Sequence, residues 1–271
     1  SSAASDVYKR QPYVLSVHTQ PDENWKIEKK TFMYLLRHIS EKTVSHIGVQ
    51  YADIVLPVYK SIVPYVKRLG AEKVEVVYNI INPTFLQKKH NYALSHPIRL
   101  ITVGRQTREK NPENIIKATA MLNSVSLLVV GDGPYNSYLR KITEKYGLQS
   151  KVTFKKRIPN DDLCKMLPEF DIFVAHSDYC EIPKAVMEPL LTGLPVIINR
   201  RNGTPVPEFE GDHVLIVENS TKGYYEAINH LIKDNKYREQ IGRKGYEYAW
   251  KNWAPQKMEK QIVDIYKGLM V

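Results

Sequence analysis

The stretch IRLITVGRQTREK, at residues 98–110, decides the fold of this chain. Its first part, 98–104, is almost continuously apolar, which is typical of a strand buried on both faces of a parallel sheet. A glycine then lets the chain turn off the strand, and three cations follow it. The same order, an apolar run and then glycine, returns in VSLLVVGDGP at residues 125–134. Both stretches predict a strand that is followed directly by a turn.

Similar short apolar runs recur on either side of these two. They lie at residues 13–18, 53–59, 73–78, 151–155, 171–176, 195–199 and 213–217. Between them, residues 224–232 carry apolar side chains at helical spacing, and Asn111-Pro112-Glu113 is typical of a helix start. Strands that alternate with helices predict an α/β fold, doubly wound around parallel sheets with right-handed crossovers.

The domain organisation follows from length and strand count. A chain of 271 residues is long enough for about two domains. Residues 81–97 hold two prolines and two asparagines with little periodicity, so we predict a partial first domain with its linker at 12–97 and a second domain with closing helices at 98–271. Residues 1–11 resemble a translated sequencing adapter and are expected to be non-native. We therefore expect the first domain to be truncated at its N-terminal end.

A final helix is predicted over about residues 254–270. It would place Met258, Ile262, Ile265 and Leu269 on one face, so it needs a partner surface.

Composition narrows the function classes. With 43% hydrophobic and 25% charged residues the chain is globular, and no apolar run approaches the ~20 residues of a membrane-spanning helix. The formal charge of +10 favours ligands that carry phosphate, nucleic acid or an anionic membrane. Cys164 and Cys180 cannot form a disulfide framework and indicate a reducing compartment, so we expect the protein to be cytoplasmic.

Two of the turns after strands carry candidate binding residues, because ligands of open α/β sheets bind outside the carboxyl ends of the strands. In the first, Gly104 is followed by Arg105 and Lys110, which could grip phosphate oxygens or form a solvated basic loop. In the second, Gly131 and Gly133 allow close approach of a backbone, although a tight turn explains them equally well.

A third candidate is the segment CEIPKAVME at residues 180–188, followed by GLPVI at 193–197. Pro183 suits a helix start, so the free amides of Lys184 and Ala185 could bind an anion. Glu188 would lie on that helix, where its carboxylate could accept hydrogen bonds from a ribose or pair with a neighbouring cation.

The order of these motifs, VGR with a following lysine, VGDGP, VTF and then MEPLLTGLPVI, resembles the donor half of a retaining glycosyltransferase of the GT-B fold, family 4. The resemblance covers residues 98–270 well and 12–82 more loosely. It implies two Rossmann-like domains, the first on the acceptor side and the second binding a nucleotide-sugar. It also implies sugar transfer to a hydroxyl of a glycan, lipid-linked or small-molecule acceptor, as in cell envelope polysaccharide biosynthesis.

The resemblance gives roles to individual residues. It implies that Arg105 and Lys110 bind the diphosphate, that Glu188 holds the ribose, and that the backbone at Arg157 and Ile158 contacts the base. The implied donor site consists of Gly104, Arg105, Lys110, Gly131, Gly133, Arg157, Ile158, Glu181, Pro183, Lys184, Ala185 and Glu188. The implied catalytic residues are His18, Glu181, Arg105 and Lys110.

Two of these assignments leave alternatives open. His18 matches a histidine that faces the donor sugar, but a histidine at a strand end is often structural. The family spaces its two acids eight positions apart, whereas Glu181 and Glu188 are seven apart and Cys180 occupies the eighth position. Either Glu181 serves from a loop shifted by one residue, which we favour, or the first acid is replaced.

The mechanism that the resemblance implies needs no cofactor beyond the nucleotide-sugar itself. The acceptor hydroxyl attacks the face that the diphosphate leaves, and cations stabilise the departing charge. The chain has no Asp-x-Asp motif and no zinc spacing, so we expect no metal.

Three alternatives remain at this point. One is a GT-B-like nucleotide-sugar epimerase, for which no clear catalytic set is seen. Another is a non-catalytic nucleic-acid-binding protein with basic patches at Lys26–Lys30 and Lys155–Arg157, although no known module accompanies them. The third is peripheral contact with the inner face of an anionic membrane through Asn24–Lys42, which mixes aromatic, apolar and basic residues.

Overall fold

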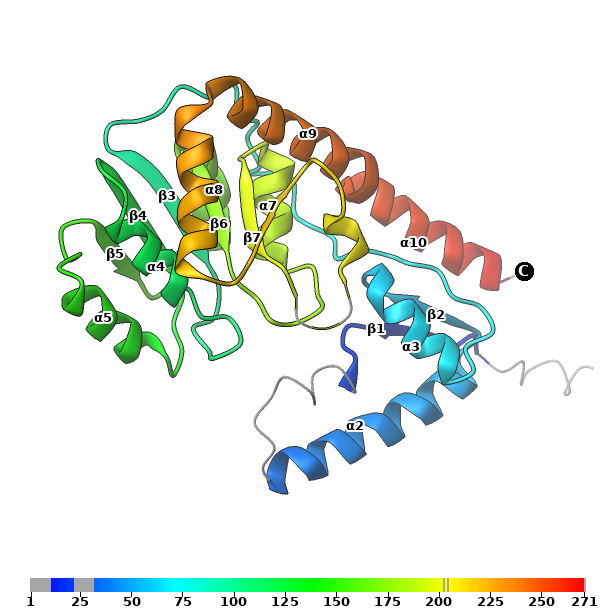
Figure 1. The fold of residues 1–271 in the computed structure, drawn as a ribbon. Helices are drawn as coiled ribbons and strands as arrows, with labels where there is room; N and C mark the ends of the chain where they lie inside the picture. Colours follow the sequence, from blue (N-terminus) through cyan, green and yellow to red (C-terminus); the bar gives the residue numbers. More distant parts are fainter. Residues whose placement is uncertain (1–10, 22–31, 202, 204, 271) are drawn as a thin grey trace, which may run out of the picture. The chain divides into compact units, whose positions relative to one another are not determined.

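The computed structural model describes residues 11–21, 32–201, 203 and 205–270. These residues form two compact units (Figure 1). The first unit contains the chain up to Asn79 together with Gln256–Val271, and the second contains Ile80–Pro255.

The second unit is built on a six-stranded sheet in which every pairing is parallel. Its strands are β3 (Ile98–Val103), β4 (Val125–Val130), β5 (Val152–Lys155), β6 (Ile172–Ala175), β7 (Val196–Asn199) and β8 (Leu215–Val217), in the order β5-β4-β3-β6-β7-β8. Each lies within a predicted run, and the predicted α/β fold is confirmed. The chain leaves β3 in one direction and β6 in the other, so the strand order reverses between these two strands. This reversal marks the expected ligand crevice.

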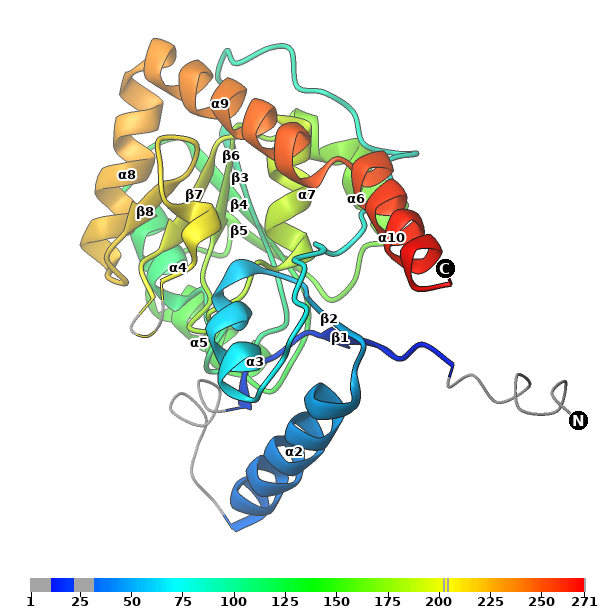
Figure 2. The same cartoon turned by 90° about the vertical axis from the view of Figure 1, so that its right-hand side faces the viewer.

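Helices cover both faces of this sheet, as Figure 2 shows. On one face α4 (Glu113–Ala120) packs against α5 (Asn136–Lys145) and α8 (Thr221–Lys233). The other face carries α6 (Asn160–Met166), the short helix η3 (Leu167–Glu169), α7 (Lys184–Thr192) and α9 (Asn235–Trp253), with α7 packed against α9. A further short helix, η4 (Pro207–Phe209), joins β7 to β8.

The core of the second unit lies between the sheet and its helices. Its most deeply buried side chains include Leu100, Ile115, Ile116, Leu139, Ile172, Tyr224 and Ile228, all 0% exposed. The α4 helix begins where the sequence predicts a helix start, and Asn111 Oδ1 accepts a hydrogen bond from the Glu113 amide at 3.0 Å. This bond satisfies one of the free amides at the helix start.

The first unit contains a pair of parallel strands, β1 (Val14–Val17) and β2 (Ile54–Pro57). Its helices are α2 (Phe32–Tyr51), η2 (Lys60–Ile62), α3 (Val63–Arg68) and most of α10 (Pro255–Leu269). The predicted strand at 73–78 differs in the structure. Its backbone makes three hydrogen bonds to β2, but only one bridge, Val55 to Val74, is formed, so it is extended chain beside the sheet.

The closing helix α10 finds its partner surface in the first unit. Ile262, Ile265 and Leu269 pack on a cluster built from β1, β2 and the extended segment at 73–78. Gln261 Nε2 also donates a hydrogen bond to Glu75 Oε1 at 2.7 Å. Residues 256–271 therefore belong to the first unit, whereas the sequence placed them with the second domain.

The segment before β3 also differs from its predicted assignment. Lys89 Nζ donates to the carbonyl of Phe170 at 2.7 Å, and Arg238 Nη2 donates to the carbonyl of Tyr92 at 2.7 Å. Both cations are buried, and they bind residues 80–97 to the second unit. Tertiary bonds of this kind leave no periodic pattern in the sequence, so the division falls after Asn79 and not after residue 97.

Several predictions concern residues outside the described part. These are the adapter-like residues 1–10, the basic patch Lys26–Lys30, and residues 24–31 of the proposed membrane-contact stretch. Within the described part of the chain, no helix has the length and apolar character needed to cross a bilayer.

Candidate functional site

The loops that follow β3 and β6 meet where the strand order reverses. Lys110, in the first loop, places its Nζ 2.5 Å from Glu181 Oε1 in the second, and each side chain is 26% exposed. The amide of Asp178 donates to the carbonyl of Glu109 at 2.8 Å, which ties the two loops together. The structure therefore brings together two residues that the sequence assigned to one site.

Arg105 differs from Lys110 in its surroundings. Its side chain is exposed, and it makes no ion pair within the part of the chain that the structure describes. Beside it, a Cβ placed on Gly104 would meet no atom within 4 Å. The guanidinium and the adjoining backbone are thus accessible to an anionic ligand.

Gly131 and Gly133 serve the packing of this basic loop. A Cβ on Gly131 would lie 1.9 Å from the carbonyl oxygen of Gly104, and one on Gly133 would lie 2.3 Å from that of Gln106. Gln106, itself only 1% exposed, donates from Nε2 to the carbonyl of Gly131 at 2.8 Å. The glycines therefore let two backbones approach closely, and their φ angles of 134° and 155° also fit the tight turn that the sequence offered as the other explanation.

The start of α7 offers free backbone donors. Pro183 precedes the helix with φ −64° and ψ 139°, and its carbonyl accepts from the amides of Val186 and Met187. Among the described residues, the amides of Lys184 and Ala185 have no backbone acceptor. Free amides at a helix start attract negative charge.

A pocket of about 360 Å³ adjoins this helix start. It is lined by Ile80, Ile81, Asn82, Val103, Asn160, Leu163, Lys184, Ala185 and Glu188. Glu188 is only 5% exposed, and its burial raises the pKa of its carboxyl to about 7, against smaller opposing effects of Asn160 and Lys184. A carboxyl with this pKa changes charge near neutral pH. A buried carboxyl with such a shifted pKa, facing a pocket, is a candidate ligand-binding group.

The predicted base-contact residues lie in the loop between β5 and α6. Arg157 is exposed and Ile158 is partly buried. Asn160, two residues further on, lines the pocket with Glu188, although it was not among the predicted site residues. Its position just after the predicted base-contact loop was the only available signal. Asn82 and Leu163, also in the lining, carried none.

His18 lies in the first unit, directly after β1. Its side chain is exposed, and its Nε2 lies 3.0 Å from Ser16 Oγ. Its carbonyl accepts a hydrogen bond from the Tyr59 hydroxyl at 2.9 Å. The catalytic role of His18 stays a prediction.

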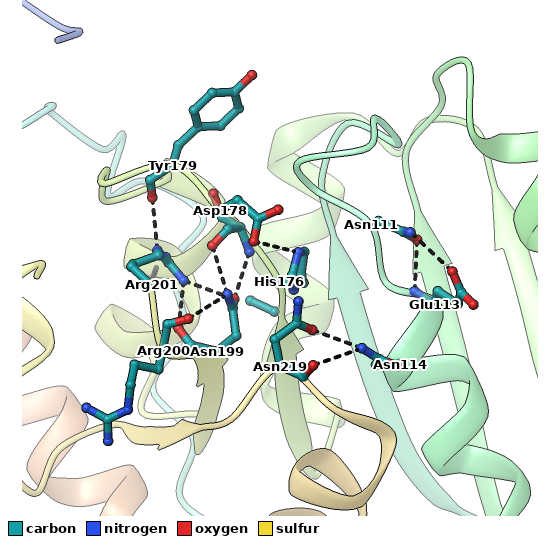
Figure 3. Close-up of polar contacts among 12 residues, drawn as sticks. Asn111, Glu113, Asn114, His176, Asp178, Tyr179, Asn199, Arg200, Arg201 and Asn219 are labelled. Atoms are coloured by element: carbon teal, nitrogen blue, oxygen red, sulfur yellow. Dashed lines mark hydrogen bonds and ion pairs between the residues drawn. The ribbon is translucent and has the colours of Figure 1, made fainter. Parts of the chain in front are cut away.

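A second polar cluster at the ends of β6 and β7 fixes the loop that carries Glu181 (Figure 3). Asn199 accepts from the Ser177 amide at 2.9 Å and donates to the Ser177 carbonyl at 3.0 Å. Arg201 Nε donates to the Tyr179 carbonyl at 2.9 Å. Burial lowers the pKa of the Arg201 guanidinium, which is only 8% exposed. No local sequence pattern reveals these two residues, because they bond to each other and to backbone atoms of a loop that is distant along the chain.

Comparison of the sequence with known proteins identifies the family of the chain. Residues 86–248 match the family model described as glycosyl transferases group 1. An uncharacterized glycosyltransferase of Methanocaldococcus jannaschii is 23% identical over 96% of this chain and 70% of its own length. The chain spans 70% of the length of that relative and 48% of the length of the spore coat protein SA of Bacillus subtilis, to which it is 25% identical.

Solved structures show the same fold. Sucrose-phosphate synthase from Thermosynechococcus elongatus superposes with a TM-score of 0.79 at 18% identity, covering 98% of this chain and 70% of the synthase. Anabaena HepE, in complex with UDP and glucose, gives a TM-score of 0.78 at 17% identity, covering 95% of this chain and 72% of HepE. With more than half of its residues matched by the family model, the chain belongs to the group 1 glycosyl transferases and has the GT-B fold.

Proposed function

We propose that this chain is a retaining glycosyltransferase of family 4, which transfers a sugar from a nucleoside-diphosphate sugar to a hydroxyl of a glycan, lipid-linked or small-molecule acceptor. One observation carries the proposal. At the reversal of strand order, a basic loop, a helix start with free amides and a pocket with a buried carboxyl occur together. The family match favours this function over an epimerase or a nucleic-acid-binding protein.

The chemistry of the site fits a diphosphate leaving group. As the glycosidic bond breaks, negative charge develops on the departing diphosphate, and Arg105, Lys110 and the amides at the start of α7 supply fixed positive potential. The sugar develops positive charge, and the acceptor hydroxyl attacks from the side that the diphosphate leaves. The diphosphate accepts the hydroxyl proton. Because cations and amides of the chain supply the positive potential at the departing diphosphate, the proposal requires no metal ion.

Glu188 and the pocket would hold the nucleoside. A ribose hydroxyl donates to a carboxylate more strongly than to a neutral carboxyl, because hydrogen bonds to charged groups are the stronger kind. The base would then lie beside Arg157 and Ile158. UDP is the first nucleotide to test, since the structurally similar HepE is solved with it.

Calorimetric titration of the chain with UDP, GDP and ADP tests the donor site. We expect one nucleotide to bind without metal, and Arg105→Ala to weaken that binding by about 1–3 kcal/mol, as for a charge-assisted hydrogen bond. Arg108→Ala is the matched control, because Arg108 is an exposed cation of the same loop. Equal affinity of all three proteins would contradict the assignment of Arg105.

A second observation favours peripheral contact with an anionic membrane. The described part of the predicted stretch begins α2, where Phe32, Leu36 and Ile39 are 73%, 48% and 53% exposed. Arg37 and Lys42 lie on the same helix and are also exposed. An apolar face flanked by cations is the composition of helices that lie in a lipid interface.

Sedimentation with vesicles tests this contact. We expect the chain to bind phosphatidylserine vesicles at low salt and to dissociate as salt screens the attraction. Leu36→Glu should abolish binding, whereas Glu226→Gln, on the exposed surface of α8 in the other unit, should not change it. Sedimentation that is equal with neutral vesicles would contradict the proposal.

A further inference from the structure

We propose that Glu181 is a resident counter-ion of Lys110, which the diphosphate of the donor must displace in order to bind. This inference rests on the proposed function and concerns the control of the same site. It gives Glu181 a role different from that of a sugar-contacting acid.

The contact between the two side chains carries the proposal. Lys110 Nζ and Glu181 Oε1 are 2.5 Å apart, and about three quarters of each side chain is shielded from solvent. A carboxylate at that distance offsets most of the charge that the ammonium would offer to a phosphate. Arg105, in the same loop, has no such partner among the described residues, so it remains free to meet the ligand first.

The loop that carries Glu181 is held in place by bonds that do not involve Lys110. Arg201 donates to the Tyr179 carbonyl, as Figure 3 shows. Asn199 bonds twice to Ser177. The Asp178 amide is bound to the carbonyl of Glu109. Because the residues on its N-terminal side are fixed, Glu181 is presented to Lys110 in a defined position.

The residue before Glu181 could not take over its contact with the lysine. The position eight residues before Glu188 is Cys180, which is buried and 5% exposed. A thiol there cannot accept strong hydrogen bonds from sugar hydroxyls as a carboxylate does. The carboxylate belongs to the next residue, Glu181, and its Oε1 meets Lys110.

The consequence is a competition for one ammonium group. Breaking a partly buried ion pair costs free energy that must be subtracted from the binding of the diphosphate. Removing the charge of Glu181 should therefore tighten nucleotide binding, whereas removal of an acid that serves as a ligand would weaken it.

The test compares Glu181→Gln with the wild-type chain by calorimetry, using UDP and UDP-glucose. We expect the Kd of both ligands to fall by about threefold to tenfold, the range for a pair between exposed and buried. Glu109→Gln is the matched control, since it removes one negative charge from the neighbouring loop, and we expect less than a twofold change. The gain should shrink at high salt.

Coupling to Lys110 is checked in a double-mutant cycle. In a Lys110→Gln background, where the pair is already broken, Glu181→Gln should change the Kd of UDP by less than twofold. An unchanged UDP affinity with weaker UDP-glucose binding in Glu181→Gln alone would overturn the inference and make Glu181 a sugar ligand. If no variant binds any nucleotide, the proposed function fails instead, so the two failures can be told apart.

Discussion

The two units bury their apolar residues to very different extents. In the second unit, every residue of β6 and β7 is buried, and helices cover both faces of the sheet. In the first unit, α2 exposes large apolar side chains such as Phe32 at 73% and Val44 at 67%. The side of α2 with partly buried positions carries His38, Glu41, Ser45 and Gly48, and Val49 near the end of the helix is buried at 1% exposed. A helical pattern can therefore exist without the burial that usually accompanies it.

The sharpest way to break this comparison is to truncate one apolar side chain in each unit. Leu100 is 0% exposed in β3, and Ile39 is 53% exposed in α2. Leu100→Ala removes contacts and leaves a cavity, so we expect a loss of about 2–5 kcal/mol in the free energy of unfolding. Ile39→Ala should change it by less than about 0.5 kcal/mol. Urea unfolding followed by circular dichroism measures both.

The result for Ile39→Ala tells whether the apolar face of α2 is exposed in solution. A loss comparable to that of Leu100→Ala would mean that the apolar face of α2 is covered in solution, for example by a second copy of the chain. Repeating the measurement at several protein concentrations would identify that case, because the stability of an associated state depends on concentration.

The second unit shows how far sequence patterns determine a fold. Short apolar and β-branched runs predicted all six of its strands. The signal is clearest in β6 and β7, which are buried throughout, and weaker in β5, where Thr153 and Lys155 are exposed. Residues 73–78 follow the same pattern but form only one bridge. A run of apolar residues predicts burial, and the regular ladder depends on neighbours that the run itself does not encode.

The parts of the candidate site that consist of neighbouring residues could be predicted from the sequence, whereas the parts that depend on distant residues could not. Glycine after β3 and proline before α7 act on the backbone at their own positions, and the cations follow that glycine closely in the sequence, so their pattern could be found. Arg201 and Asn199 act by bonding the backbone of another loop, and Asn160 reaches the pocket from a third. Such residues look ordinary in a sequence, because their partners are distant along the chain.

A smaller effect is expected from Glu188, a buried carboxyl of the second unit. Burial raises the pKa of Glu188 from 4.5 to about 7, so the folded chain binds a proton more tightly than the unfolded chain does. The favourable contribution of the protonated carboxyl is complete below about pH 4.5 and is lost as the pH rises to about 7. Glu188→Gln stays neutral, and we expect it to raise the free energy of unfolding by up to about 3 kcal/mol near pH 8.

The pH dependence distinguishes this cause from a change in packing. Urea unfolding at a series of pH values should show the gain of Glu188→Gln falling toward zero as the pH drops to 4.5, the ordinary value for the carboxyl. Glu259→Gln, at an exposed position of α10 in the first unit, should show no such trend. The same Glu188 variant should bind the nucleotide more weakly, because the ribose loses a charged acceptor. Stability that rises while binding falls is the pattern of a group kept at a cost for its ligand, and a constant gain at every pH would contradict it.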